Sequence, residues 1–175
     1  MERETVVNNA LELAGVPTRI QSLWDGSPQA LIARDQWARV RDEALAARPW
    51  EFARNYAVLA EGTIDAYFPW VHRWTYPDSA ITVLDVYGVT SPYIVTPFRW
   101  IEVHNGTSHR EILTDFDNAR ASFTRRVMEV DDWPPPFIAV VIAGLAERFA
   151  QVFGGQDGTD ARGRSEQRPR RDGVS

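Results

Sequence analysis

The sequence predicts an α+β fold: a bundle of three or four helices, a β-rich insertion between the second and third main helices, and an extended C-terminal arm. Apolar residues recur at helical spacing in the first 50 residues and again after residue 135. Between these segments, short runs rich in β-branched and aromatic residues are separated by turn signals. A single domain is expected over residues 1–155, because a chain of this size with 44% hydrophobic residues can build one core.

The first two helices have clear start and stop signals. We expect the first at about residues 4–14, since acids lie in its first turn and Gly15 follows it. The second is expected at about residues 28–47, where Ser27 supplies an N-cap, a proline follows in the first turn and Pro49 ends the helix. Along its apolar face, small or aromatic residues recur at helical spacing: Ala33, Trp37, Val40, Ala44 and Ala47.

The third main helix is expected at about residues 135–153, ending before Gly154. Its first half is apolar nearly all round, which predicts burial on several sides, within the chain or against a neighbour. Asp131 and Asp132 precede it. They are interpreted as ordinary capping residues, with a Mg²⁺-binding or acid/base pair as the alternative.

The β insertion is expected at about residues 55–130. An Asn-Gly turn at residues 105–106 predicts a hairpin that joins Ile101 to the strand containing Ile112. The first predicted strand is apolar on both faces and is therefore expected to be covered on both. The best strand candidates are residues 81–87, 98–103, 111–115 and 122–130.

Residues 156–175 are expected to form a polar, arginine-rich arm. They contain almost no apolar side chains and cannot bury enough surface to fold alone. Two interpretations stay open: a solvated end, or an arm that binds a partner or a neighbouring subunit. The arginines proposed for that binding are Arg162, Arg164, Arg168, Arg170 and Arg171.

The composition argues against several classes of protein. A formal charge of −5 disfavours a protein whose main task is to wrap nucleic acid. The absence of cysteine removes thiolate metal sites and cysteine nucleophiles, and all 19 basic residues are arginine, so Schiff-base chemistry has no lysine. The N-terminus lacks the apolar segment of a signal peptide, and the longest apolar run, residues 137–146, is too short to span a bilayer. We therefore expect no membrane insertion.

No residue pattern predicts catalysis, a metal site or a cofactor. The only histidines are His72, His104 and His109, and the five-residue spacing of the last two matches no standard metal-ligand pattern. The seven tryptophans are expected to anchor the core or an interface. Stacking of nucleic-acid bases on Trp70, Trp74 and Trp100 is a further alternative. A convergent nucleophile, base and orienting group is missing, so a non-enzyme is predicted.

Several segments, in this order, resemble the head-to-tail adaptor (connector) proteins of tailed phages. These are the proteins called tail tubular protein A in podoviruses, and related proteins occur in gene transfer agents. The main segment is RDQWARVRDEALAARPWEFARNYAVL, in which a helix leads into Arg48, Pro49, Trp50, Phe52 and Ala53. The others are ALELAGVPTRIQSLWDGS before it, then WTYPDSAITVLDVYG, RWIEVHNG, REILTD and FIAVVIAGLAERFA, so that the resemblance covers about residues 4–155.

The resemblance implies a structural subunit of a virion or phage-like particle at the head-tail junction, assembled in the host cytoplasm. Its partners would be the portal protein, neighbouring adaptor subunits in a ring of twelve copies, and a downstream tail or stopper protein. DNA would pass through the lumen without specific binding. We expect Trp37, Pro49, Trp50 and Phe52 to be structural anchors. The alternative is a small-ligand or nucleic-acid-binding module built on the β insertion.

Overall fold

The computed structural model describes residues 1–62, 67, 69–91, 94–97, 99–104, 106 and 109–154, with the side chains of residues 89–91 and 94–97 left out. The fold is mixed α+β, as predicted. In chain order the helices and strands are α1 (Arg3–Leu13), α2 (Pro28–Ala46), β1 (Arg54–Val58), β2 (His72–Thr75), β3 (Ala80–Ser91), β4 (Ile94–Pro97), β5 (Trp100–His104), β6 (Arg110–Thr114), β7 (Arg120–Arg125) and α3 (Pro135–Phe153).

The chain divides into two compact units. Met1–Arg41 and the segment from Trp133 through α3 form a helical unit, and Asp42–Asp132 form a β unit that includes the last turn of α2. Single 3₁₀ turns follow α2, at Glu51–Ala53, and precede α3, at Val130–Asp132. In the described residues, the seven strands therefore lie in sequence between α2 and α3.

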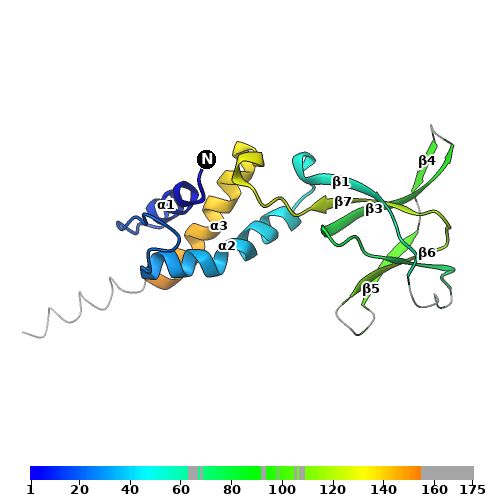
Figure 1. Ribbon diagram of the computed structural model, residues 1–175, viewed down its shortest axis with the longest axis horizontal. Coiled ribbons are helices and arrows are strands. Elements are labelled where there is room, and N and C mark those ends of the chain that lie inside the picture. Colours follow the sequence, from blue (N-terminus) through cyan, green and yellow to red (C-terminus); the bar gives the residue numbers. More distant parts are fainter. Residues whose placement is uncertain are drawn as a thin grey trace, which may run out of the picture. The chain divides into compact units, whose positions relative to one another are not determined.

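In the helical unit, α1 packs along α3 (Figure 1). The rings of Trp37 and Trp133 stack with centroids 5.6 Å apart, and Phe137 meets Trp133 edge-on at 5.0 Å. Close packing of α2 on α3 requires Gly144, because a Cβ there would lie 2.8 Å from Val40 Cγ1. The buried apolar side chains of this core include Val6, Val7, Ala10, Leu11, Ala30, Ala33, Trp37, Val40, Phe137, Val141, Leu145 and Phe149.

The helix ends follow the predicted signals with one exception. Gly15 ends α1 in the left-handed region, at φ 75°, and Val16 N donates to Leu11 O at 2.9 Å, as in a Schellman motif. The Ser27 hydroxyl accepts a hydrogen bond from Ala30 N at 3.2 Å, so the predicted N-cap of α2 is confirmed. The predicted capping of α3 by two aspartates is wrong. The residue before α3 is Pro134, which makes no side-chain cap, and Asp131 and Asp132 lie in the preceding 3₁₀ turn.

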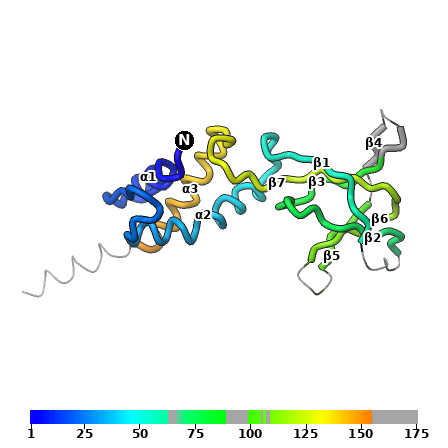
Figure 2. Tube along the Cα trace, viewed as in Figure 1, coloured from blue at the N-terminus to red at the C-terminus, as the bar shows by residue number. Residues whose placement is uncertain are grey.

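Two antiparallel sheets form the β unit. One has the strand order β1-β7-β3-β4 and the other β2-β6-β5; Figure 2 traces β1, β7 and β3 side by side. β5 and β6 pair as the predicted hairpin, with Ile101 opposite Leu113 and Gly106 in the turn at φ 81°. The core cluster contains Leu59, Trp74, Tyr76, Ala80, Val83, Val86, Ile112, Ala119, Ala121 and Phe123.

Strand β3 is not buried on both faces, contrary to the prediction. Its core residues are Ala80, Val83 and Val86, whereas Leu84 is half-buried and Asp85 is exposed. The pairing with β7 shifts register between Val83 and Asp85, and such a bulge turns the next residues to the other face. The bulge therefore places Val86, and not Asp85, on the core face after Val83.

Among the residues described, α3 is the only helix long and apolar enough to cross a bilayer by length and composition. Core helices meet the same criterion. Phe137, Val141, Leu145 and Phe149 are fully buried at helical spacing, whereas Val140 on the other side of the helix is 40% exposed. Val152 continues the buried face one turn beyond Phe149, where it is 49% exposed. This distribution is that of an amphipathic helix with one face in a protein core.

Candidate functional site

Trp50 fixes the point at which α2 ends and the β unit begins. Its side chain is 6% exposed, and its Nε1 donates to Ala44 O at 2.8 Å. Ala44 lies in the last turn of α2, where backbone carbonyls have no partner within the helix. The Arg48 guanidinium lies 3.7 Å from the centre of the Trp50 ring, and the ring of Phe52 meets Trp50 edge-on at 6.0 Å. One indole therefore closes a helix end and packs against the turn that leads into β1.

The other predicted anchors differ in burial. Trp37 is 6% exposed in the helical core, with the Arg3 guanidinium 5.9 Å from its ring centre. Phe52 is half-buried and Pro49 is exposed. Pro49 therefore contributes a stop signal for α2 and not packing, whereas the two tryptophans bury large apolar surfaces.

The three histidines are not part of a metal-binding group in the described residues. His72 stacks on Trp74 with ring centroids 5.9 Å apart, and His104 and His109 flank the turn of the β5–β6 hairpin, where both are exposed. In the described part of the chain, no group of three histidine or acidic residues is placed to hold a metal ion. Chemistry that depends on such a cluster has no site among these residues.

The three tryptophans considered for base stacking do not form one exposed platform. Trp74 is 8% exposed in the β core, and Trp100 packs partly buried against the same core. Trp70 is half-buried, and the Arg99 guanidinium lies 4.5 Å from its ring centre. Because a base needs an accessible ring face, Trp74 cannot serve in this way without unfolding the core.

A Tyr76–Arg110 cluster joins the two sheets, and the sequence did not predict it. Tyr76 Oη accepts a hydrogen bond from Val83 N at 2.9 Å, and the Arg110 guanidinium lies 3.8 Å from the Tyr76 ring centre. Arg110 also donates to Ala80 O at 3.0 Å and to Ile81 O at 3.2 Å. Burial raises the pKa of the Tyr76 hydroxyl, so Tyr76 is a neutral structural group and not a candidate base.

A second unpredicted pair is the buried ion pair between Arg73 on β2 and Glu111 on β6. Arg73 Nη1 lies 3.1 Å from Glu111 Oε2, with side-chain exposures of 10% and 7%. The distance is that of an ion pair, but the geometry is not that of a hydrogen bond. Arg73 and Glu111 lie two residues apart across the strand register, so their side chains share a face of the sheet.

Large apolar side chains are exposed on both units. The most exposed is Trp24, at 75%, in the connector between α1 and α2. On β1, at the edge of its sheet, Tyr56 is 59% exposed and Val58 is 65% exposed. The other exposed apolar side chains in the described residues include Leu13, Leu31, Tyr67, Val71, Phe116, Met128, Val140 and Val152. Such side chains are the usual material of protein interfaces.

No protein-family model matches the chain, and no curated protein matches it either. The five arginines predicted to bind a partner, Arg162, Arg164, Arg168, Arg170 and Arg171, lie outside the described residues. The described part of the candidate site is therefore the buried Trp50 junction and the exposed apolar side chains of the two units.

Proposed function

We propose that the chain is a structural head-to-tail adaptor subunit, which forms a ring beneath the portal of a tailed phage or phage-like particle. In this role it extends the DNA channel and docks the tail. The proposal rests on the resemblance of the sequence segments to the adaptor family. The observation in the structure that supports it best is the Trp50 junction, because it gives the family's Pro-Trp-x-Phe-Ala segment a physical role.

The architecture is compatible with this role. In the proposal, α1, α2 and α3 are the helical bundle of the adaptor, and the strands between α2 and α3 are its β insertion. A ring subunit must cover apolar surface with its neighbours. The exposed side chains of Trp24, Tyr56 and Val58 supply such surface on both units.

The charge of the chain also supports a channel protein that does not hold DNA. Each subunit carries a formal charge of −5, so a ring of about twelve copies would carry about −60. We expect acidic residues to line the lumen, since phosphate would then slide without adhering. A continuous belt of arginine around the channel of the assembled ring would contradict this.

The arm formed by residues 156–175 is proposed to bind the portal through its arginines. Removing the chain after Gly155 should leave both units folded, because α3 ends at Phe153. The shortened chain should co-sediment with the portal more weakly than the intact chain, and binding by the intact chain should weaken with salt.

A length-matched control separates charge from chain length. In this control the five arginines of the arm are changed to glutamine and the rest of the chain is kept. It should bind as weakly as the truncated chain if guanidinium contacts to carboxylates hold the arm. Equal portal binding by the intact, truncated and glutamine forms would refute the arm and leave the ring proposal to be tested separately.

A further inference from the structure

An open groove of about 470 Å³ lies in the helical unit, between the first turns of α2 and the end of α3. Figure 1 shows these two segments beside each other. Leu31, Ile32 and Val152 give the groove apolar lining, and Asp35, Arg39 and Arg148 give it charge. Its size is in the range that accommodates a few side chains of a bound segment.

The apolar part of this surface is exposed although α2 and α3 are otherwise packed. Leu31 is 47% exposed and Val152 is 49% exposed, whereas their neighbours Ala30 and Phe149 are fully buried. Two aliphatic side chains on adjacent helices thus face solvent across one groove. Covering both would remove apolar area from water, which favours a bound partner over the empty groove.

An exposed tryptophan, Trp24, lies beside the first turns of α2. The Arg34 guanidinium, one helical turn after Leu31 on α2, lies 4.5 Å from the centre of the Trp24 ring. An exposed tryptophan whose ring contacts an arginine is typical of an interface residue, because the indole is large and loses little entropy on binding.

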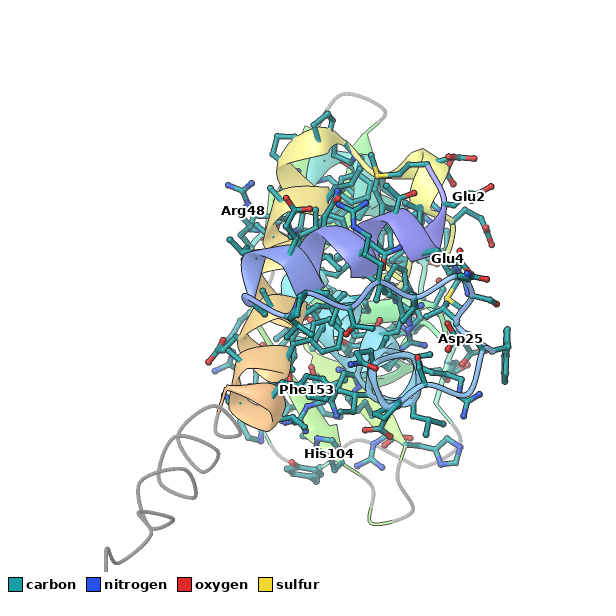
Figure 3. The ribbon with its side chains drawn as sticks, turned by 90° about the vertical axis from the view of Figure 1, so that its left-hand side faces the viewer. Glu2, Glu4, Asp25, Arg48, His104 and Phe153 are labelled. Atoms are coloured by element: carbon teal, nitrogen blue, oxygen red, sulfur yellow. The ribbon has the colours of Figure 1, made fainter. Side chains whose placement is uncertain are left out.

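The connector that carries Trp24 is fixed before any partner binds. Asp25 Oδ1 accepts hydrogen bonds from Ser27 N at 2.9 Å and from Ser27 Oγ at 2.6 Å, and Oδ2 accepts from Gln21 N at 3.0 Å. Asn8 on α1 exchanges two hydrogen bonds with the backbone of Ile20, at 2.9 and 3.0 Å. Figure 3 shows Asp25 in this connector. A preorganised loop lowers the entropic cost of binding.

The charges of the surface distinguish between occupants. In the lining of the groove, Arg39 and Arg148 stand against Asp35, a formal charge of +1 on a chain whose total is −5. The chain's own residues 156–175 carry five arginines and four acids, a formal charge of +1, and almost no apolar side chains. They match neither the charge nor the apolar lining of the groove. An occupant with carboxylates beside aliphatic side chains matches both.

We propose that this arginine-flanked groove binds an acidic amphipathic segment of a partner protein, with aliphatic side chains seated on Leu31 and Val152 and carboxylates facing Arg39 and Arg148. This binding mode is that of a helix in a hydrophobic groove. It does not depend on the adaptor role.

The test uses the full chain and a labelled helical peptide of about 15 residues, long enough for four turns, with leucines one turn apart and glutamates beside them. A second peptide has lysine at every glutamate position. Fluorescence anisotropy should show saturable binding of the glutamate peptide that weakens with added salt, and much weaker binding of the lysine peptide. The absence of saturable binding, or equal binding of both peptides, would overturn the proposal.

Variants locate the site. Leu31→Asp and Arg148→Glu should each weaken binding of the glutamate peptide by about tenfold or more. Val58→Asp is the matched control, because Val58 is 65% exposed on the β unit and should bind the peptide like the wild type. Circular dichroism checks that each variant is folded. Tighter peptide binding after removal of residues 156–175 would show that the chain's own arm occupies the groove, and would overturn the proposal of a partner segment.

Discussion

Trp50→Ala should destabilise the protein by about 3–5 kcal/mol, the usual cost of truncating a buried tryptophan. The side chain is 6% exposed, so nearly all of its apolar area returns to water in the unfolded state. The substitution also removes the hydrogen bond from Nε1 to Ala44 O, which contributes about 1 kcal/mol. The carbonyl of Ala44, at the end of α2, then loses this donor. For a chain of this length, the loss corresponds to a fall in Tm of about 6–20 °C.

Urea unfolding followed by far-UV circular dichroism measures the effect, since seven tryptophans would complicate fluorescence. Trp50→Phe separates the two contributions. It keeps most of the ring and loses the donor, so its cost should be about 1–3 kcal/mol. Trp24→Ala is the matched control, because Trp24 is 75% exposed and its loss should change the free energy of unfolding by less than about 1 kcal/mol. If Trp50→Ala unfolds like the wild type, the junction does not stabilise the fold.

Three further substitutions test contacts elsewhere. Gly144→Ala should destabilise the protein by about 1–3 kcal/mol, although alanine favours a helix, because the new Cβ would lie 2.8 Å from Val40 Cγ1. In thermal melts, the double variant Gly144→Ala, Val40→Ala should lose less stability than the sum of the two single variants. Glu111→Gln should cost about 3–5 kcal/mol in urea unfolding, since it leaves the Arg73 charge buried; replacing both residues by apolar ones should cost less. Hydrogen bonds from the Ser27 side chain and backbone hold the Asp25 pKa at about 2, below its ordinary 3.8. The charged carboxylate therefore stabilises the fold above pH 3.8, and this stabilisation is lost as the pH falls toward 2. The free energy of unfolding of Asp25→Asn should lack this change between pH 3.8 and 2.

The helices were predictable to within about one residue at each end, because their signals are local. Gly15, Ser27 and Gly154 act through backbone geometry and capping that the adjacent sequence decides. The face of α2 was also predictable, except that Ala47, beyond its end, is exposed. The α3 pattern misplaced Val152, which is 49% exposed, because periodicity cannot tell where the packing partner stops.

The strands were harder to predict because pairing decides them. β1 and β2 were missed: Arg54–Val58 contains Arg and Asn, and His72–Thr75 has four residues with no alternation, so neither is a strong strand by itself. They are strands because β7 and β6 pair with them. The last strand was predicted to reach residue 130 but ends at Arg125, beyond which Arg126 N donates to Ser79 O. That contact is long-range and leaves no local signal.

The candidate site was partly predictable. The importance of Trp50 could be predicted from its place between a helix stop and the β insertion, and from the resemblance of its segment to the adaptor proteins. The Arg73–Glu111 pair and the Tyr76–Arg110 cluster could not be predicted, since each joins residues from different strands and depends on the register. The exposed Trp24 carried no signal either, because a tryptophan in a connector is as often buried.

Electron microscopy of the intact chain mixed with its portal protein tests the central claim most directly. The adaptor proposal predicts closed rings of the chain, of about twelve copies, stacked coaxially on the portal and continuing its channel, as expected for a closed cyclic assembly. Portal particles that carry no added density, with the chain remaining monomeric at the same concentrations, would contradict the proposal.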